Sequence, residues 1–195
     1  MATSANVTAG KPKTTGAIFV GATSLAMPTN ATTALPTGFT EVGYASEDGL
    51  TNANSRTVEN IKAWGGDTVL TPQTEKTDTF SFTLLEAANV DVLKIIHGDG
   101  NVSGTLADGI SVEVNAEELP YKAWVFEMIY KGAVKRVVVP RAKVTEIGDV
   151  TYTDSNAVAY PITITAEPDA DGNTHYEYIK AVSNSGTTTT STSTT

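Results

Sequence analysis

The stretch 38–64 reads GFTEVGYASEDGLTNANSRTVENIKAW and follows the short apolar run GAIFVG at 16–21. Apolar and polar residues alternate over 39–44, which is the pattern of a half-buried β-strand. The acidic turn SEDG at 46–49 interrupts the alternation, which resumes over 58–64. The stretch therefore favours a fold built from strands and turns.

Alternation with a period of two continues along most of the chain. It predicts strands at 17–20, 39–45, 57–64, 67–70, 78–86, 110–114, 121–130, 133–140, 143–151, 157–166 and 175–182. In the 78–86 strand, Phe80, Phe82 and Leu84 share one face. Lys131 and Gly132 predict a hairpin between two of these strands, and the residues DADGN at 169–173 predict a second turn. We expect a mainly β fold in which antiparallel neighbours are joined by short turns.

One interval departs from this pattern. Residues 87–97 have apolar side chains at near-helical spacing and stop at Gly98, so they predict a single short α-helix. Such a helix, laid against one face of a β-sandwich, would close an otherwise open core. Pro140 and Pro161 lie inside or at the ends of strand patterns, and their missing N–H groups limit the pairing of the sheet there.

Composition narrows the classes of protein. A chain of 195 residues fits one domain. Aromatic residues make up only 7% while Thr, Ala, Val and Gly are abundant, which favours strands and turns. No apolar run is long enough to span a membrane, and residues 1–15 lack the apolar core of a secretory signal. The absence of cysteine excludes disulfides and thiolate metal sites.

The chain is acidic, with a formal net charge of −9 from 22 acids and 13 bases. This excess argues against a protein whose main task is to grip nucleic-acid phosphates. Five bases cluster in one strand-rich segment: Lys131, Lys135, Arg136, Arg141 and Lys143. They form either a solvated strand face or a basic patch that meets an acidic patch on a neighbouring copy.

Both ends of the chain lack a strand or helix pattern. Residues 1–15 are rich in Ala, Thr and Lys, and residues 183–195 (SNSGTTTTSTSTT) are an uncharged low-complexity run. Neither end carries enough apolar surface to offset the entropy of ordering. We expect a flexible N-terminal arm at 1–15, one β-domain at 16–182 and a flexible tail at 183–195.

The sequence contains no complete motif for metal binding or catalysis. Asp99 begins a run that resembles an EF-hand calcium loop, but Ile110 stands where the bidentate Glu belongs. His97 and His175 are the only histidines. His97 lies at the end of the predicted helix, where a cation is favourable, so a structural role accounts for it. His175 begins an ordinary strand. No phosphate-binding loop, dinucleotide motif or nucleophile elbow occurs. We therefore predict no enzyme activity, no catalytic residue, no metal and no cofactor.

The opening stretch also carries a resemblance. Residues 43–49 (GYASEDG), Arg56 and residues 61–64 (IKAW) are similar to a turn, an arginine and a following run in the major tail tube proteins of long-tailed phages, of the siphovirus type, that infect Gram-positive and particularly actinobacterial hosts. The resemblance extends more loosely from about Gly16 to Ile179. This motif is structural and says nothing about chemistry.

The resemblance implies two packed antiparallel sheets with a flanking helix, in a subunit that forms homohexameric rings stacked into a tube. DNA would pass through the lumen without specific binding, and the partners would be the tape measure protein and the tail terminator and tip proteins. It further implies a virion protein assembled in the host cytoplasm, without a membrane contact. A long hairpin at 39–64, with its tip at 46–56, and the arm at 2–15 would reach neighbouring subunits or rings.

Candidate contact and lumen residues follow from these expectations. Trp64 and Trp124 either both pack in the core, or Trp64 anchors a subunit contact beside Gly65 and Gly66, where backbones can approach closely. The contact candidates are Glu47, Asp48, Arg56, Trp64, Lys135 and Arg136, and the lumen-facing candidates are Glu41 and Glu59. A negative wall would let DNA slide, but a shift of one residue in strand register inverts which side chains face the lumen.

Two other classes of protein remain open. An extracellular β-sandwich that binds a ligand or an adhesion partner would also suit the Thr-rich tail and the acidic charge, although the chain shows no signal peptide. A β-sandwich enzyme comes third, because the sequence offers no convergent set of polar residues. Long tubes in the electron microscope would favour the tube protein, whereas dispersed monomers would favour the binding module.

Overall fold

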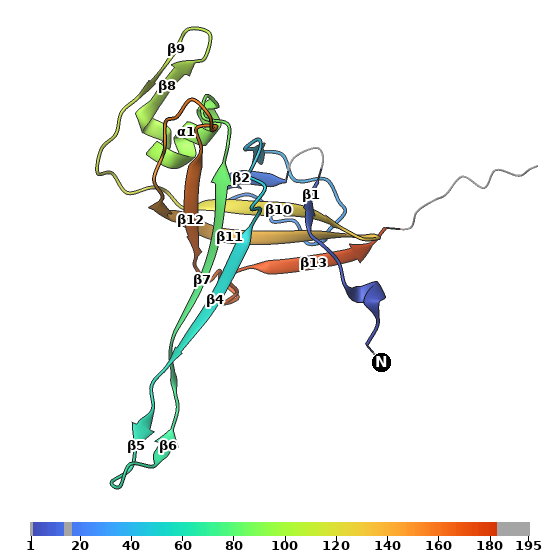
Figure 1. Cartoon of the computed structure of the whole chain (residues 1–195), viewed down its shortest axis with the longest axis vertical. Coiled ribbons are helices and arrows are strands. Elements are labelled where there is room, and N and C mark those ends of the chain that lie inside the picture. Colours follow the sequence, from blue (N-terminus) through green and yellow to red (C-terminus); the bar gives the residue numbers. More distant parts are fainter. Residues whose placement is uncertain (1, 14–16, 183–195) are drawn as a thin grey trace, which may run out of the picture.

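The computed structural model describes residues 2–13 and 17–182 (Figure 1). The predicted tail at 183–195, residue 1 and residues 14–16 lie outside the described residues. The strands are β1 (Lys11–Pro12), β2 (Ile18–Ala22), β3 (Thr40–Glu41), β4 (Thr51–Val58), β5 (Ile61–Lys62), β6 (Thr68–Leu70), β7 (Gln73–Leu84), β8 (Val102–Thr105), β9 (Gly109–Val112), β10 (Lys122–Tyr130), β11 (Ala133–Ile147), β12 (Tyr160–Ala166) and β13 (Tyr176–Ala181). The helices are α1 (Val90–His97) and the 3-10 turns η1 (Ser4–Asn6) and η2 (Asp99–Asn101).

The fold is mainly β, as predicted. Over the described ranges, nine strands form one antiparallel sheet in the order β3-β2-β10-β11-β12-β7-β4, with β1 beside β10 and β13 beside β11. Two further pairs form separate two-stranded sheets: β5 with β6 continues the β4–β7 pair outward, and β8 with β9 lies beside α1 (Figure 1). No helix among the described residues is long and apolar enough to cross a membrane.

The long strand β11 connects two layers of the sheet. On one edge of β11, residues 133–138 pair with β13 and residues 142–147 pair with β12. On its other edge, β10 pairs from Ala133 to Ala142. Pro140 lies between these halves, so it limits the pairing as expected, but one strand runs through it where the sequence predicted two. In Figure 1, β10 and β11 run across the view while β7 and β4 run down it, so the layers cross steeply.

The core lies between these layers. Phe80 and Phe82 of β7 contact Phe126 and Trp124 of β10, and the ring centroids lie 5.7 Å apart in both pairs. Leu84 is also fully buried, so the shared face predicted for the 78–86 strand is confirmed. Large aromatic side chains thus hold the two layers together.

The helix α1 covers one end of this core. The Asn89 side chain accepts a hydrogen bond from the Asp91 N–H and caps the first turn, so the helix begins later than the predicted 87–97. Gly98 ends it with a left-handed φ of 98°, and its N–H donates to the Lys94 carbonyl. Buried residues Val92, Leu93, Ile95 and Ile96 face the sheet, and the predicted flanking helix is confirmed.

A long hairpin projects from the body, but not where the sequence predicted it. β4 pairs with β7 from Thr51 opposite Ser81 to Val58 opposite Gln73, and β5 and β6 extend the pair outward. The tip of this hairpin, which we define as residues 61–70, turns at Gly65 and Gly66. Residues 39–64 therefore do not form a hairpin of their own with a tip at 46–56, because the partner of β4 is β7. The polar β4 sequence TNANSRTV shows no alternation of apolar and polar residues, so the sequence did not predict this strand.

The turn at 169–173 also differs in part from its prediction. The Asp169 N–H donates to the Asn173 carbonyl and the Gly172 N–H donates to the Asp169 carbonyl, so the turn itself is confirmed. The strands that it joins, β12 and β13, pair with different halves of β11 and not with each other. The turn thus moves the chain between the two layers.

Candidate functional site

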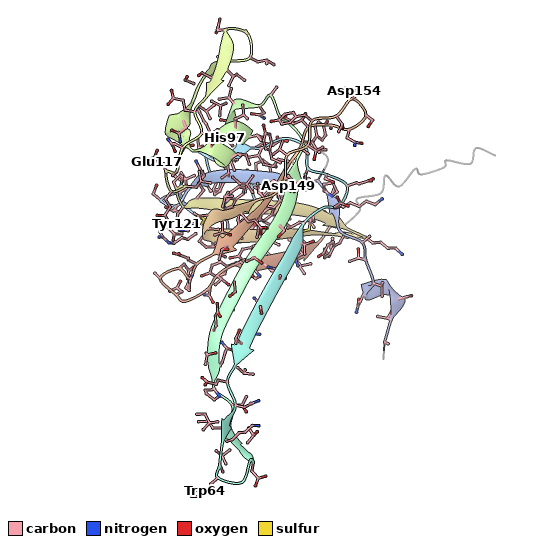
Figure 2. The ribbon with its side chains drawn as sticks, turned by 60° about the vertical axis from the view of Figure 1, so that its left-hand side comes forward. Trp64, His97, Glu117, Tyr121, Asp149 and Asp154 are labelled. Atoms are coloured by element: carbon pink, nitrogen blue, oxygen red, sulfur yellow. The ribbon has the colours of Figure 1, made fainter. Side chains whose placement is uncertain are left out.

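The tip of the long hairpin exposes several large apolar side chains. Trp64 is fully exposed, at 107% of its reference area, and stands at the extremity of the molecule (Figure 2). Ile61, Val69 and Leu70 of the same tip are also exposed. Trp124 is buried in the core, so the expectation that both tryptophans pack there is confirmed for Trp124 and wrong for Trp64. A group of uncovered apolar side chains of this kind is a surface suited to a partner.

Other sequence candidates lie along the same hairpin or near its base. Arg56 is exposed on β4 opposite Lys76, and Glu59 is exposed just beyond β4. Glu47 and Asp48 occupy the turn before β4, where the Ser46 hydroxyl donates to the Asp48 carboxylate at 2.9 Å. Glu41 is exposed in β3. All of these side chains can reach a second molecule, but Arg56 and Glu59 lie along the hairpin, whereas Glu41, Glu47 and Asp48 lie near its base.

A cleft of about 760 Å³ opens in the body beside the base of the hairpin. We call it the body cleft. Its walls come from the end of the N-terminal arm, the start of β2, the chain from β3 to β4, and β10: Gly10, Pro12, Lys13, Ala17, Ile18, Glu41, residues 43–50, Glu86 and residues 126–128. Phe126, Met128 and Leu50 supply apolar surface, whereas Glu47 and Asp48 supply negative charge. The size suits a large side chain or a small ligand.

The end of the predicted arm forms part of this cleft. Lys11 and Pro12 pair with Ile129 and Met128 of β10, and the Lys13 ammonium lies 2.5 Å from the Glu127 carboxylate. This portion of the arm is therefore bound to its own chain, in contrast to the expected flexible segment.

Arg136 is a contact candidate that the structure excludes. Its side chain is 2% exposed, and its guanidinium donates to the Glu127 carboxylate. It also donates to the Asn30 carbonyl at 2.7 Å and to the Thr33 carbonyl at 2.8 Å. Arg136 thus ties the loop at 30–33 to the inner strands. It cannot meet a neighbouring subunit without losing this network.

The other clustered bases are mostly neutralised within the chain. Lys135 pairs with Glu177 at 2.6 Å, Arg141 with Glu167 at 2.9 Å, and Lys143 with Glu118. Arg141 also lies over the Tyr121 ring, 3.7 Å from its centroid. The hydrogen bond from Lys143 lowers the pKa of Glu118 below its ordinary value. These pairs favour a solvated, internally paired strand face, and Lys135 remains a contact candidate only as a prediction.

A buried carboxylate fixes the base of the hairpin. Asp78 of β7 is 1% exposed and accepts hydrogen bonds from Thr174 at 2.5 Å, from Asn52 at 2.8 Å and from His175 at 2.5 Å. Burial raises the pKa of Asp78, but the three hydrogen bonds outweigh it and lower the pKa below its ordinary value. Sequence reasoning missed this residue, because its partners come from β4 and from the loop before β13.

The Asp78 site predicts how stability depends on pH. A lowered folded-state pKa stabilises the fold above the unfolded pKa of about 3.9, and this contribution is lost as the pH falls through the folded value. We expect Asp78→Asn to lower the free energy of unfolding by about 2 kcal/mol at pH 7, since hydrogen bonds to a charged group are lost. The difference from wild type should shrink below pH 4, as measured by urea unfolding. A difference that is the same at pH 7 and pH 3 would contradict this.

The two histidines have structural partners. His97 contacts Tyr160 edge to face, and burial lowers its pKa below the ordinary value, so the cation expected at the helix end is disfavoured. His175 binds Asp78 and lies against Phe80. Within 2–13 and 17–182, no three His, Cys, Asp or Glu side chains gather to hold a metal ion.

Comparisons with known proteins place the chain in context. The model of a family described as phage tail tube protein matches residues 1–190. No curated protein matches the sequence. Among solved structures, the cryo-EM structure of the anti-feeding prophage cap, described as the AFP tube terminating cap, has a TM-score of 0.41 at 10% identity, over 93% of this chain and 100% of that chain.

Proposed function

The chain belongs to the phage tail tube protein family, and we propose from this membership that it polymerises as stacked hexameric rings into the tube of a long-tailed phage. The role is structural, and the family is not one of enzymes. The observation that carries the proposal is the projecting hairpin with its uncovered apolar tip. A subunit with such an extension has a surface that a neighbouring copy can cover.

The geometry of repeated contacts supports a tube. A contact between unlike patches of identical subunits closes a ring when its rotation allows and extends as a filament when it does not. The hairpin lies along the longest axis of the molecule, away from the crossed layers of the body (Figure 1). Contacts between bodies would close each ring, and the hairpins would link one ring to the next.

The acidic excess has a role in this proposal. A DNA duplex carries about one negative charge per 1.7 Å of its axis and would bind to a basic wall. Exposed Glu59 would face the lumen, and so would Glu41, which also lines the body cleft. DNA would then pass without specific binding on its way into the host. A reconstructed tube whose channel wall is neutral or positive would contradict this assignment.

The proposal extends to the location of the protein, its partners and the host of the phage. The protein would lie in the virion tail after assembly in the host cytoplasm, next to the tape measure protein and the terminator and tip proteins. The host would be Gram-positive and particularly actinobacterial, because residues 43–49, Arg56 and residues 61–64 resemble the tail tube proteins of phages that infect such hosts.

Electron microscopy of the purified protein tests the proposed function. We expect long tubes of uniform diameter that form as the protein concentration rises. Monomers that stay dispersed under all conditions would contradict it and favour the extracellular binding module.

A further inference from the structure

The exposed tip and the body cleft are complementary in character. Trp64 carries a large apolar ring on a turn whose glycines, Gly65 and Gly66, have open space around them, so the ring projects without obstruction. Lys62 stands two residues away on the same tip and is exposed. The body cleft offers apolar walls with Glu47 and Asp48 beside them. A cleft of about 760 Å³ has room for an indole ring and for the alkyl stem of a lysine.

The tip cannot occupy the cleft of its own chain. The cleft lies at the Thr51 end of β4, and the limb from Thr51 to Trp64 is mostly extended, so at roughly 3.3 Å per residue it places Trp64 about 40 Å away. β4 is hydrogen-bonded to β7 along its length, which prevents the hairpin from folding back. A tip that occupies the cleft must therefore come from another molecule.

We propose that the tip of each subunit inserts Trp64 into the body cleft of a second copy of this chain, with Lys62 beside Glu47 and Asp48. This inference rests on the proposed function and names the partner surface of the hairpin. Each copy has one tip and one cleft, and these are unlike surfaces, so the contact repeats head to tail. Buried aromatic rings are typical anchors of such contacts, and opposite charges at the rim set the orientation.

The proposal also predicts a distance. Two copies joined in this way are displaced along the hairpin by at most about 40 Å, because that is the reach of the limb. A tube built from this contact should show an axial repeat of that size or somewhat smaller, according to the tilt of the hairpin.

Site-specific photocrosslinking in assembled tubes tests the contact. Trp64 is replaced by p-benzoylphenylalanine, and the variant is co-assembled as a minor fraction with isotope-labelled wild-type chain, so that tubes form even if the variant alone does not assemble. We expect the dominant crosslink to join position 64 to residues 43–50 or 126–128 of a labelled copy. The same probe at Leu106, an exposed position on the β8–β9 hairpin, is the matched control and should not reach the cleft.

The outcomes separate the two claims. Tubes whose crosslinks from position 64 map to other surfaces, or to the same chain, overturn the inference and leave the proposed function intact. Wild-type chain that forms no tubes overturns the proposed function and the inference with it. A crosslink to the cleft that disappears with Lys62→Glu and returns when Glu47→Lys is added would support the charge pairing.

Discussion

Replacing residues 61–70 with an Asn-Gly turn is expected to abolish tube formation while leaving a soluble, folded subunit. The new turn would join Asn60 to Thr71, which already lie together, since the Thr71 hydroxyl donates to the Asn60 side chain at 3.0 Å. Asn-Gly is the preferred two-residue connection of a hairpin. The deletion removes the exposed apolar tip, and the loss of an aromatic anchor costs about 2 kcal/mol or more at each contact. Sedimentation and electron microscopy measure the assembly, and urea unfolding measures the fold.

The β8–β9 hairpin provides the control for this experiment. Leu106→Ser removes an exposed apolar side chain from that second hairpin end, and we expect normal tubes from it. Normal tubes from the 61–70 replacement would show that the hairpin tip does not link subunits. Loss of the cooperative unfolding transition in that variant would instead place the tip residues among those that stabilise the subunit.

Arg136→Met is expected to destabilise the subunit by about 3–5 kcal/mol. The change keeps much of the side-chain volume but leaves the buried Glu127 carboxylate with Lys13 as its remaining cationic partner among the described residues. It also removes the donors to the carbonyls of Asn30 and Thr33. Lys13 still pairs with Glu127 from a half-exposed position, but the carboxylate loses its buried partner, and removing one partner of a buried ion pair is the costly case. The free energy of unfolding in urea measures the loss.

Lys135→Met is the matched control, one residue away on the same strand. Its partner Glu177 is 43% exposed, so water can replace the ion pair, and we expect a change within about 1 kcal/mol. Equal losses from the two variants would mean that the Arg136 network contributes no more than a surface pair.

Much of the body could be predicted from the sequence. Alternation marked the inner half of β7, because one face of that strand packs on the aromatic core. The runs of apolar residues in β10 and the first half of β11 marked strands that are buried on both faces. The helix α1 was visible from its apolar spacing and from Gly98. The base of the hairpin was missed because β4 is exposed on both faces, and a strand without a buried face shows no alternation.

The candidates for contact residues were harder to judge, because burial and exposure depend on which strands pair. The sequence could have identified Arg136 as internal: a hairpin that turns at Lys131 and Gly132 places Glu127 opposite Arg136, and opposite charges facing across apolar strands indicate a buried pair. The two glycines after Trp64 were a signal for a turn with an exposed ring. The Asp78 site has no comparable signal, because Asn52 and Thr174 are brought to it only by the tertiary fold.

A cryo-EM reconstruction of tubes assembled from the purified chain tests the central claim most directly, because it locates every hairpin relative to its neighbours. We predict a hollow tube of stacked rings in which each β4–β7 hairpin crosses to the next ring and its tip, with Trp64, is buried against another copy. Tubes in which Trp64 remains exposed and the hairpins touch no other subunit would contradict this account.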